Sequence, residues 1–180
     1  MPLPVPLAIP LAAFAALPAR AQTSSTAYAF SFDGLDGTTI RLSDHAGRVL
    51  LVVNTASSCG FTPQYADMQA LHDRYGPRGL VVLAVPSDDF TQELESNDAV
   101  ADFCQIQLGL DIPLTEITPV TGEGAHPFYR WLAEEHGHRP RWNFNKALIG
   151  PEGELLGFWG STTRPTARVI TRTIEGALPR

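Results

Sequence analysis

The sequence contains few cysteines, few basic residues and no long hydrophobic run. Its 180 residues include only Cys59 and Cys104, and 13 Lys and Arg against 19 Asp and Glu. The basic residues are scattered and the net charge is −6, which argues against binding to the phosphates of nucleic acids. Because no run of about 20 apolar residues occurs, stable membrane insertion is not expected. The composition, 44% hydrophobic, is typical of one globular domain.

The first 21 residues differ from the rest. Residues 7–17 form a short apolar run, and Ala19-Arg20-Ala21 before Gln22 matches the small-residue pattern of signal-peptide cleavage. No Lys or Arg precedes the run and prolines interrupt it, so a disordered leader or a misassigned start is the alternative. We interpret residues 1–21 as a signal peptide cleaved after Ala21. Residues 22–180 then form a single exported domain of net charge −7, most simply in a bacterial periplasm.

The hydrophobic pattern predicts an α/β fold. Alternating residues on both sides of Asp36-Gly37 (27–32 and 38–42) indicate an N-terminal β-hairpin. Two buried strands (49–53 and 79–85) flank a helix (63–75), and such a βαβ unit makes the strands parallel. Further helices are expected over 97–108, 126–136 and 166–178, and a second hairpin over 147–159. The result is a mixed sheet with helices on both faces and a ligand site at the carboxyl ends of its parallel strands.

Cys59 lies at that edge of the sheet, directly after the strand over 49–53. Thr62 is the expected N-cap of the following helix and Pro63 its first residue. The free N–H groups at a helix N-terminus favour thiolate, which is the reactive form of cysteine. The sequence therefore predicts a reactive Cys59, open to solvent. In an exported protein a structural Cys59–Cys104 disulfide is the alternative.

Three motifs in order carry a resemblance to a known family. They are V-N-T-A-S-S-C-G-F-T-P-Q-Y (53–65), G-A-H-P (124–127) and W-N-F-N-K (142–146). Over residues 30–178 the chain resembles the glutathione peroxidase family. The resemblance implies a thioredoxin-like three-layer sandwich and thiol-dependent reduction of hydrogen peroxide or organic hydroperoxides in the response to oxidative stress. It implies no cofactor and no metal.

The same resemblance implies the catalytic residues. The family places Gln, Trp and Asn side chains around its nucleophile, which gives Cys59 as nucleophile with Trp142 and Asn143. Gln92 is the best candidate for the glutamine, although the loop over 85–94 is one residue shorter than the family pattern and lacks its glycine pair. The indole and amide N–H groups are neutral donors for a thiolate and a developing oxyanion. We do not expect Lys146 to point at the sulfur.

Cys104 has two possible roles. Cysteine-containing relatives often use a resolving cysteine and then thioredoxin, but the family's resolving position falls at Gln105. One residue on a helix is about 100° of rotation, so Cys104 is either a possible resolving residue or a buried structural one. No glutathione-binding basic residues are recognisable, so a thioredoxin-like protein is the expected reductant rather than glutathione. The short segment between His126 and Trp142 implies a monomer.

Other thiol and metal proteins fit less well. A peroxiredoxin needs Thr or Ser and Pro where Ala56 and Val52 stand. Dithiol exchange needs C-x-x-C, and a copper chaperone needs C-x-x-x-C, but neither Thr62 nor Pro63 is a cysteine. His136 and His138 lack the further ligands of a zinc site. The remaining alternative is a non-enzymatic peroxide sensor that relays oxidation to a partner protein.

Overall fold

The centre of the fold is a four-stranded mixed sheet. The computed structural model describes residues 25–179, so the predicted signal peptide lies outside the described residues. The strand order is β4-β3-β5-β6, with β3 over Val49–Thr55, β4 over Leu80–Pro86, β5 over Lys146–Ile149 and β6 over Leu155–Trp159. Strands β3 and β4 are parallel, and the other two pairs are antiparallel. The predicted mixed sheet with its parallel βαβ unit is confirmed.

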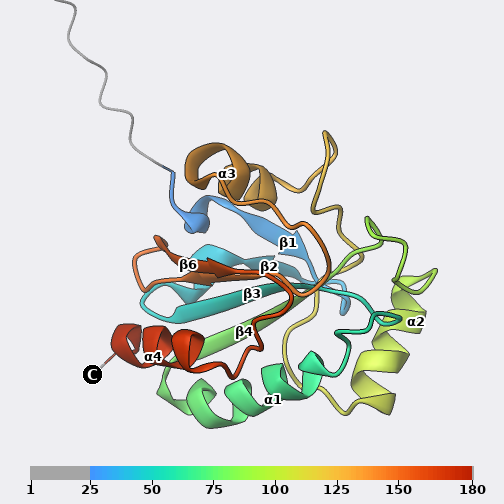
Figure 1. Cartoon of the computed structure of the whole chain (residues 1–180), viewed down its shortest axis with the longest axis horizontal. Coiled ribbons are helices and arrows are strands. Elements are labelled where there is room, and N and C mark those ends of the chain that lie inside the picture. The colour runs from blue at the N-terminus through green and yellow to red at the C-terminus, as the bar shows by residue number, and fades with distance from the viewer. Residues whose placement is uncertain (1–24, 180) are drawn as a thin grey trace, which may run out of the picture.

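Helices cover both faces of this sheet, as Figure 1 shows. Helices α1 (Gln64–Tyr75) and α4 (Arg168–Ala177) lie on one face, and α3 (Pro127–His136) lies on the other. Strand β3 is buried on both sides because its side chains alternate between two cores. Leu51 and Val53 pack with α1 and α4, whereas Leu50 and Val52 pack with α3. The predicted three-layer arrangement is confirmed.

The N-terminal hairpin is shorter than predicted. Strands β1 (Ser31–Asp33) and β2 (Thr39–Arg41) pair antiparallel. The prediction that residues 27–30 belong to the hairpin was wrong, because Ala27–Ala29 forms the 3₁₀ turn η1. The Ala27 N–H donates to the Gly153 carbonyl at 2.8 Å, so this segment is held by the β5–β6 turn. Two other 3₁₀ turns, η2 (Leu42–His45) and η3 (Gly76–Arg78), precede β3 and β4.

The start of one helix differs from the prediction, and that of another agrees with it. Helix α1 begins at Gln64 with Pro63 as its N-cap, so Thr62 does not cap it. Helix α2 (Asn97–Ala101) is capped by Ser96, whose Oγ accepts the Ala99 N–H at 3.2 Å. The Thr62 hydroxyl bonds within its own turn instead. Oδ1 of Asn97, the first residue of α2, accepts the N–H of Ile117 at 2.9 Å.

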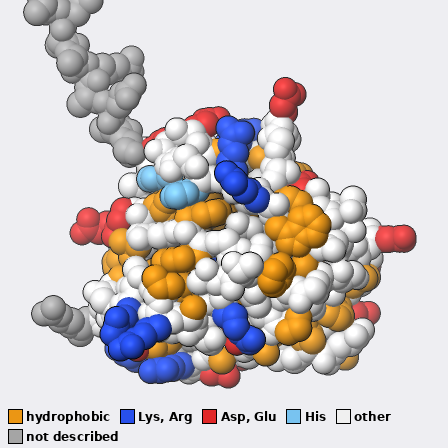
Figure 2. Space-filling view, in the orientation of Figure 1, with side chains coloured by type: hydrophobic (Ala, Val, Ile, Leu, Met, Phe, Trp, Pro, Cys, Tyr) orange, Lys and Arg blue, Asp and Glu red, His pale blue; other side chains and the backbone are white. Residues whose placement is uncertain are grey.

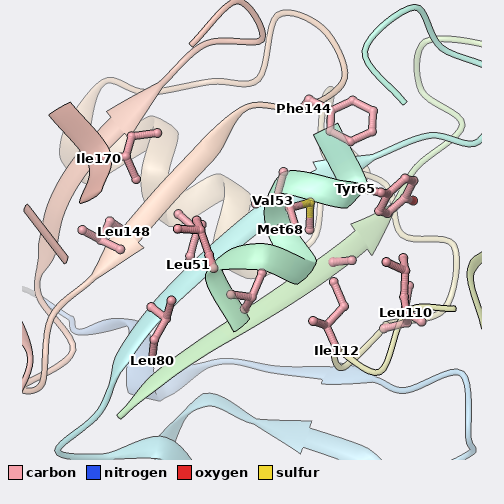
Figure 3. Packing of buried hydrophobic residues seen from close by; sticks show 14 of the residues in the cluster. Leu51, Val53, Tyr65, Met68, Leu80, Leu110, Ile112, Phe144, Leu148 and Ile170 are labelled. Carbon is pink, nitrogen blue, oxygen red and sulfur yellow. The ribbon is translucent and has the colours of Figure 1, made fainter. Parts of the chain in front are cut away.

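A π-helical turn follows α2. This segment, η4 (Asp102–Gln107), buries Cys104 completely and leaves Gln105 exposed. π-Helical turns are rare and frequently lie at functional sites. Figure 3 shows the packing of the hydrophobic core that includes Cys104, with Tyr65 and Phe144 at one end of the cluster. No helix within residues 25–179 is long and apolar enough to span a membrane.

Candidate active site

Cys59 lies in a tight turn between β3 and α1. Its sulfur accepts the N–H of Phe61 at 3.4 Å, and its own N–H donates to Oγ1 of Thr62 at 3.1 Å. The Thr62 hydroxyl also reaches the Ala56 carbonyl at 3.0 Å, so this side chain closes the turn rather than capping α1. Cys59 is only 8% exposed, which corrects the prediction of a thiol open to solvent. The Phe61 N–H is thus a neutral donor directed at the sulfur.

The turn carrying Trp142 and Asn143 faces the end of β3. Asn143 is fully buried, whereas Trp142 is 41% exposed and packs on the Phe90 ring with centroids 5.4 Å apart. Phe144 has φ = +60°, which is uncommon for a large side chain. Its ring packs edge-on against Tyr65 at 5.4 Å, deep in the core. The packing of Phe144 therefore fixes the direction of the two preceding side chains.

Asn54 holds this turn in place. It lies in β3, is fully buried, and its Nδ2 donates to the Trp142 carbonyl at 3.0 Å. Its Oδ1 accepts the Asn145 N–H at 2.9 Å, and its carbonyl accepts the Phe144 N–H at 2.6 Å. These bonds satisfy the buried backbone groups of an irregular turn, as buried peptides require. We did not single out Asn54 from the sequence, where it appears only as one letter of a motif.

Gln92 comes to the same place in spite of the shortened loop. Its Oε1 accepts a hydrogen bond from Nδ2 of Asn143 at 3.0 Å, and its carbonyl accepts the Ser58 N–H at 2.9 Å. Thr91 has φ = +54°, a strained conformation for a β-branched residue. Thr91 lies in the loop that is one residue shorter than the family pattern. Its positive φ places Gln92 at the turn beside Cys59. The site therefore brings together Cys59, Gln92 and Asn143, with Trp142 at its rim.

Lys146 contacts backbone carbonyls next to the Asn143 turn. It is fully buried, with Nζ 3.5 Å from the carbonyls of both Gly160 and Ser161. Burial lowers its pKa to about 7, and the nearby Asp67 partly opposes that shift. The Ser161 hydroxyl donates to the Asn143 carbonyl at 2.6 Å. Lys146 therefore supports the backbone of the Asn143 turn.

Cys104 is enclosed in the core beneath the site. It is fully buried, belongs to the same hydrophobic cluster as Cys59, and both cysteines are free thiols. The structural-disulfide alternative is therefore not the state seen here. Burial raises the pKa of the Cys104 thiol to about 11; its contact with the Tyr65 hydroxyl acts in the opposite direction, and Glu93 raises it further. In this conformation Cys104 is neither exposed nor readily ionised.

The histidines considered as zinc ligands have other contacts. His138 stacks on Phe158 at 4.9 Å, and His136 packs against Trp131 at 4.5 Å. His126 accepts the Phe128 N–H at the start of α3. Among residues 25–179, no group of three or more His, Cys, Asp or Glu side chains is arranged to hold a metal ion.

The comparisons with known proteins agree with this geometry. The family model of glutathione peroxidase matches residues 27–133. This chain belongs to the glutathione peroxidase family. It is 39% identical over 156 residues to the hydroperoxy fatty acid reductase gpx1 of Synechocystis, covering 81% of this chain and 92% of the relative. It is 37% identical over 163 residues to human glutathione peroxidase 7, covering 87% of each.

Solved structures support the same assignment. The crystal structure of apo Trgpx matches with a TM-score of 0.67 and 31% identity, covering 87% of this chain and all of that one. A thiol:disulfide interchange protein of the thioredoxin family from Chlorobium tepidum matches with a TM-score of 0.64 at 18% identity, covering 89% of this chain and all of that one. The second match concerns the fold alone. The predicted thioredoxin-like fold and family are both confirmed, and the relatives support thiol peroxidase activity.

Proposed function

We propose that this glutathione peroxidase family member reduces hydroperoxides through Cys59. The Cys59 thiolate attacks one oxygen of R–O–OH, the O–O bond breaks, and the leaving oxygen takes a proton to give R–OH. Cys59 then carries the hydroxyl as sulfenic acid. The observation that carries this proposal is the convergence of the Cys59 turn with Gln92 and Asn143, segments 33 or more residues apart in sequence.

Two N–H donors remain for the substrate. Asn143 uses its Nδ2 to orient Gln92. Nε2 of Gln92 and Nε1 of Trp142 make no hydrogen bond within residues 25–179, so both are available to a peroxide oxygen. Preoriented neutral donors aimed at developing negative charge are an effective way to lower a barrier. In this proposal Gln92 and Trp142 bind the leaving oxygen, and Asn143 sets their geometry.

The surface near Cys59 favours hydroperoxides with a hydrocarbon part. A shallow groove of about 310 Å³ starts beside the Cys59 turn and is lined mainly by apolar side chains, among them Pro63, Ala66, Leu108 and Leu110. Leu108, which lines this groove, is 41% exposed. Figure 2 shows one face of the molecule, where hydrophobic side chains lie at the right and the left while Lys and Arg gather at the lower left and the upper middle. The Synechocystis relative is named as a hydroperoxy fatty acid reductase, and we propose organic hydroperoxides as substrates here.

We further propose that an external thiol reduces Cys59 sulfenic acid directly. One thiol forms a mixed disulfide with Cys59 and releases water, and a second thiol then releases Cys59 as a thiol together with the external disulfide. The burial and raised pKa of Cys104 support this route over internal resolution. A thioredoxin-like dithiol protein provides both thiols in one molecule and is our proposed reductant, in preference to glutathione.

A steady-state assay tests the function. Purified protein is mixed with hydrogen peroxide or a fatty acid hydroperoxide and with reduced thioredoxin, and both peroxide and thiol loss are followed. Sustained turnover that disappears in Cys59→Ser is the expected result. If peroxide consumption stops after one equivalent and the oxidation passes from Cys59 to the thiols of one partner protein, the result would instead support the peroxide sensor.

We also propose that the protein is exported and acts as a monomer. The residues around Ala21 match a cleavage pattern, and the short segment before Trp142 matches the monomeric branch that the resemblance implies. Expression of the full chain with fractionation tests the first part: N-terminal sequencing should begin at Gln22, and an uncleaved cytoplasmic product would contradict it. Sedimentation at micromolar concentration tests the second, where a dimer mass would contradict it.

A further inference from the structure

Glu93 is a half-buried carboxylate beside the site, and the catalytic scheme leaves it unused. It follows Gln92 in the loop between β4 and α2. Its Oε1 accepts two backbone N–H groups, from Ser57 at 3.0 Å and from Leu94 at 2.9 Å. Its Oε2 is buried without a hydrogen-bond partner among the described residues. A carboxylate is rarely buried in this way unless its hydrogen bonds hold something in place.

The two bonds join the Gln92 loop to the Cys59 turn. The N–H of Ser57 points to the Glu93 carboxylate, and the next N–H, that of Ser58, points to the Gln92 carbonyl. Two consecutive amides just before Cys59 are thus bound by two consecutive residues of the opposite loop. No other side chain of the described residues accepts a hydrogen bond from the backbone of residues 56–58.

The loop also has its own anchors, which show that it is built to hold one conformation. Oδ1 of Asp88 accepts the Glu93 N–H at 3.2 Å, and Oδ2 of Asp89 accepts the N–H groups of Val120 and Thr121 at 2.6 and 2.7 Å. Thr91, between these anchors and Gln92, is in the left-handed region. The loop is therefore held at both ends of a strained residue, and Glu93 is the anchor on the Cys59 side.

We propose that Glu93 is a positioning residue for the peroxidase site, setting the placement of Gln92 relative to the sulfur by joining its loop to the Cys59 turn. This inference rests on the proposed function. The carboxylate touches neither substrate nor sulfur in this scheme and acts through the backbone of Ser57 and through Gln92. Burial raises the pKa of Glu93, and the hydrogen bonds from Ser57 and Leu94 oppose that shift by stabilising the charged form.

Three variants test the proposal by stopped-flow measurement of Cys59 oxidation by hydrogen peroxide. Glu93→Ala removes the acceptor and should lower the second-order rate constant by about tenfold, at a temperature where circular dichroism shows the variant folded. Glu93→Gln keeps an acceptor oxygen and should restore most of that loss. Glu95→Ala, a change at an exposed neighbour, is the matched control and should leave the rate constant unchanged. Equal rates for Glu93→Ala and wild type would overturn the proposal.

A double-mutant cycle separates positioning from a merely structural role. In a Gln92→Ala background, Glu93→Ala should cost less than about threefold, because the residue it positions is already absent. Additive losses would mean that Glu93 only stabilises the fold, and would overturn the proposal.

Amide hydrogen exchange provides a readout independent of catalysis. Glu93→Ala should lower the protection of the Ser57 and Leu94 amides and leave the β3 amides unchanged. If wild type reacts with no hydroperoxide, the proposed function fails, and this exchange pattern alone decides whether Glu93 joins the two segments. Unchanged protection would show that it does not.

Discussion

Nδ2 of Asn143 donates a hydrogen bond to Oε1 of Gln92 at 3.0 Å, although the two residues are 51 positions apart in sequence. This bond fixes the orientation of the Gln92 amide and leaves its N–H groups for the substrate. It also leaves Oδ1 of Asn143 buried without a partner among the described residues. A buried oxygen without a hydrogen-bond partner at the proposed site is a place where a substrate or a water can bind.

Loss of the Gln92 or Asn143 side chain should slow the reaction of Cys59 with peroxide. Gln92→Ala and Asn143→Ala should each lower the second-order rate constant by about tenfold to a hundredfold, as expected when a preoriented donor is removed. Gln107→Ala, at an exposed position away from these bonds, is the control and should react like wild type. Stopped-flow fluorescence gives the rate constants, and two unaffected variants would remove these amides from the mechanism.

Trp142→Phe should slow the first step and leave the fold intact. Phenylalanine keeps the contact with Phe90 but has no indole N–H, and the exposed position of Trp142 limits its contribution to stability. We expect a loss of about tenfold in the rate constant with little change in thermal midpoint. Trp131→Phe is the matched control: it removes an indole N–H that bonds to Ser25, far from the site in sequence, and should not slow peroxide reduction.

The sequence was sufficient to predict the layers of the fold. Strand β3 reads as an unbroken apolar run because it is buried on both faces, and the helical periods of α1 and α3 show their apolar sides directly. Local patterns were less reliable where tertiary partners intervene. The Ala27–Ala29 segment alternates like a strand, but its N–H bonds to Gly153, more than 120 residues away. A local pattern cannot contain that information.

The site shows the same division. Cys59, Trp142 and Asn143 were predicted from the motifs that carry the family resemblance. Glu93 was not singled out in the loop over 85–94, because charged loop residues are usually exposed. Only the three-dimensional structure shows that its carboxylate accepts the Ser57 N–H and that its Oε2 is buried. The position of the Gln92 side chain was also not predictable from the sequence. It depends on the positive φ of Thr91, through which the shorter loop reaches the site.

Lys146 should make stability depend on pH. Its pKa is lowered to about 7 in the folded protein from 10.5, so between these values the unfolded chain holds a proton that the folded chain has released. The free energy of unfolding contributed by this group therefore rises with pH from about 7 to about 10.5, and below 7 the cost of burying the charge is present in full.

Lys146→Met removes this titration. Urea unfolding of wild type and variant at several pH values gives the difference in their free energies of unfolding, in which other groups cancel. We expect that difference to move in favour of wild type as pH rises from 7 to 10. A difference that stays constant would contradict the burial of a titrating amine. Lys146 is the only lysine in the sequence, so no second lysine complicates the comparison.

Cys104→Ala should retain peroxidase turnover with a dithiol reductant. The thiol is buried with a raised pKa, so it is not poised to attack a sulfenic acid unless η4 unwinds. Mass spectrometry of wild type after an equimolar amount of peroxide should show sulfenic acid or its products at Cys59 and an intact Cys104 thiol. A Cys59–Cys104 disulfide in wild type, with trapped sulfenic acid in the variant, would instead make Cys104 the resolving cysteine.

The reaction of Cys59 with peroxide provides the most direct test of the proposal that this residue is the nucleophile. Wild type, Cys104→Ala and Cys59→Ser are each exposed to an equimolar amount of hydrogen peroxide with a sulfenic-acid trapping reagent, and peptides are read by mass spectrometry. We expect a trapped adduct on Cys59 in the first two proteins and none in the third. A Cys59 thiol that survives unchanged in folded wild type would contradict it.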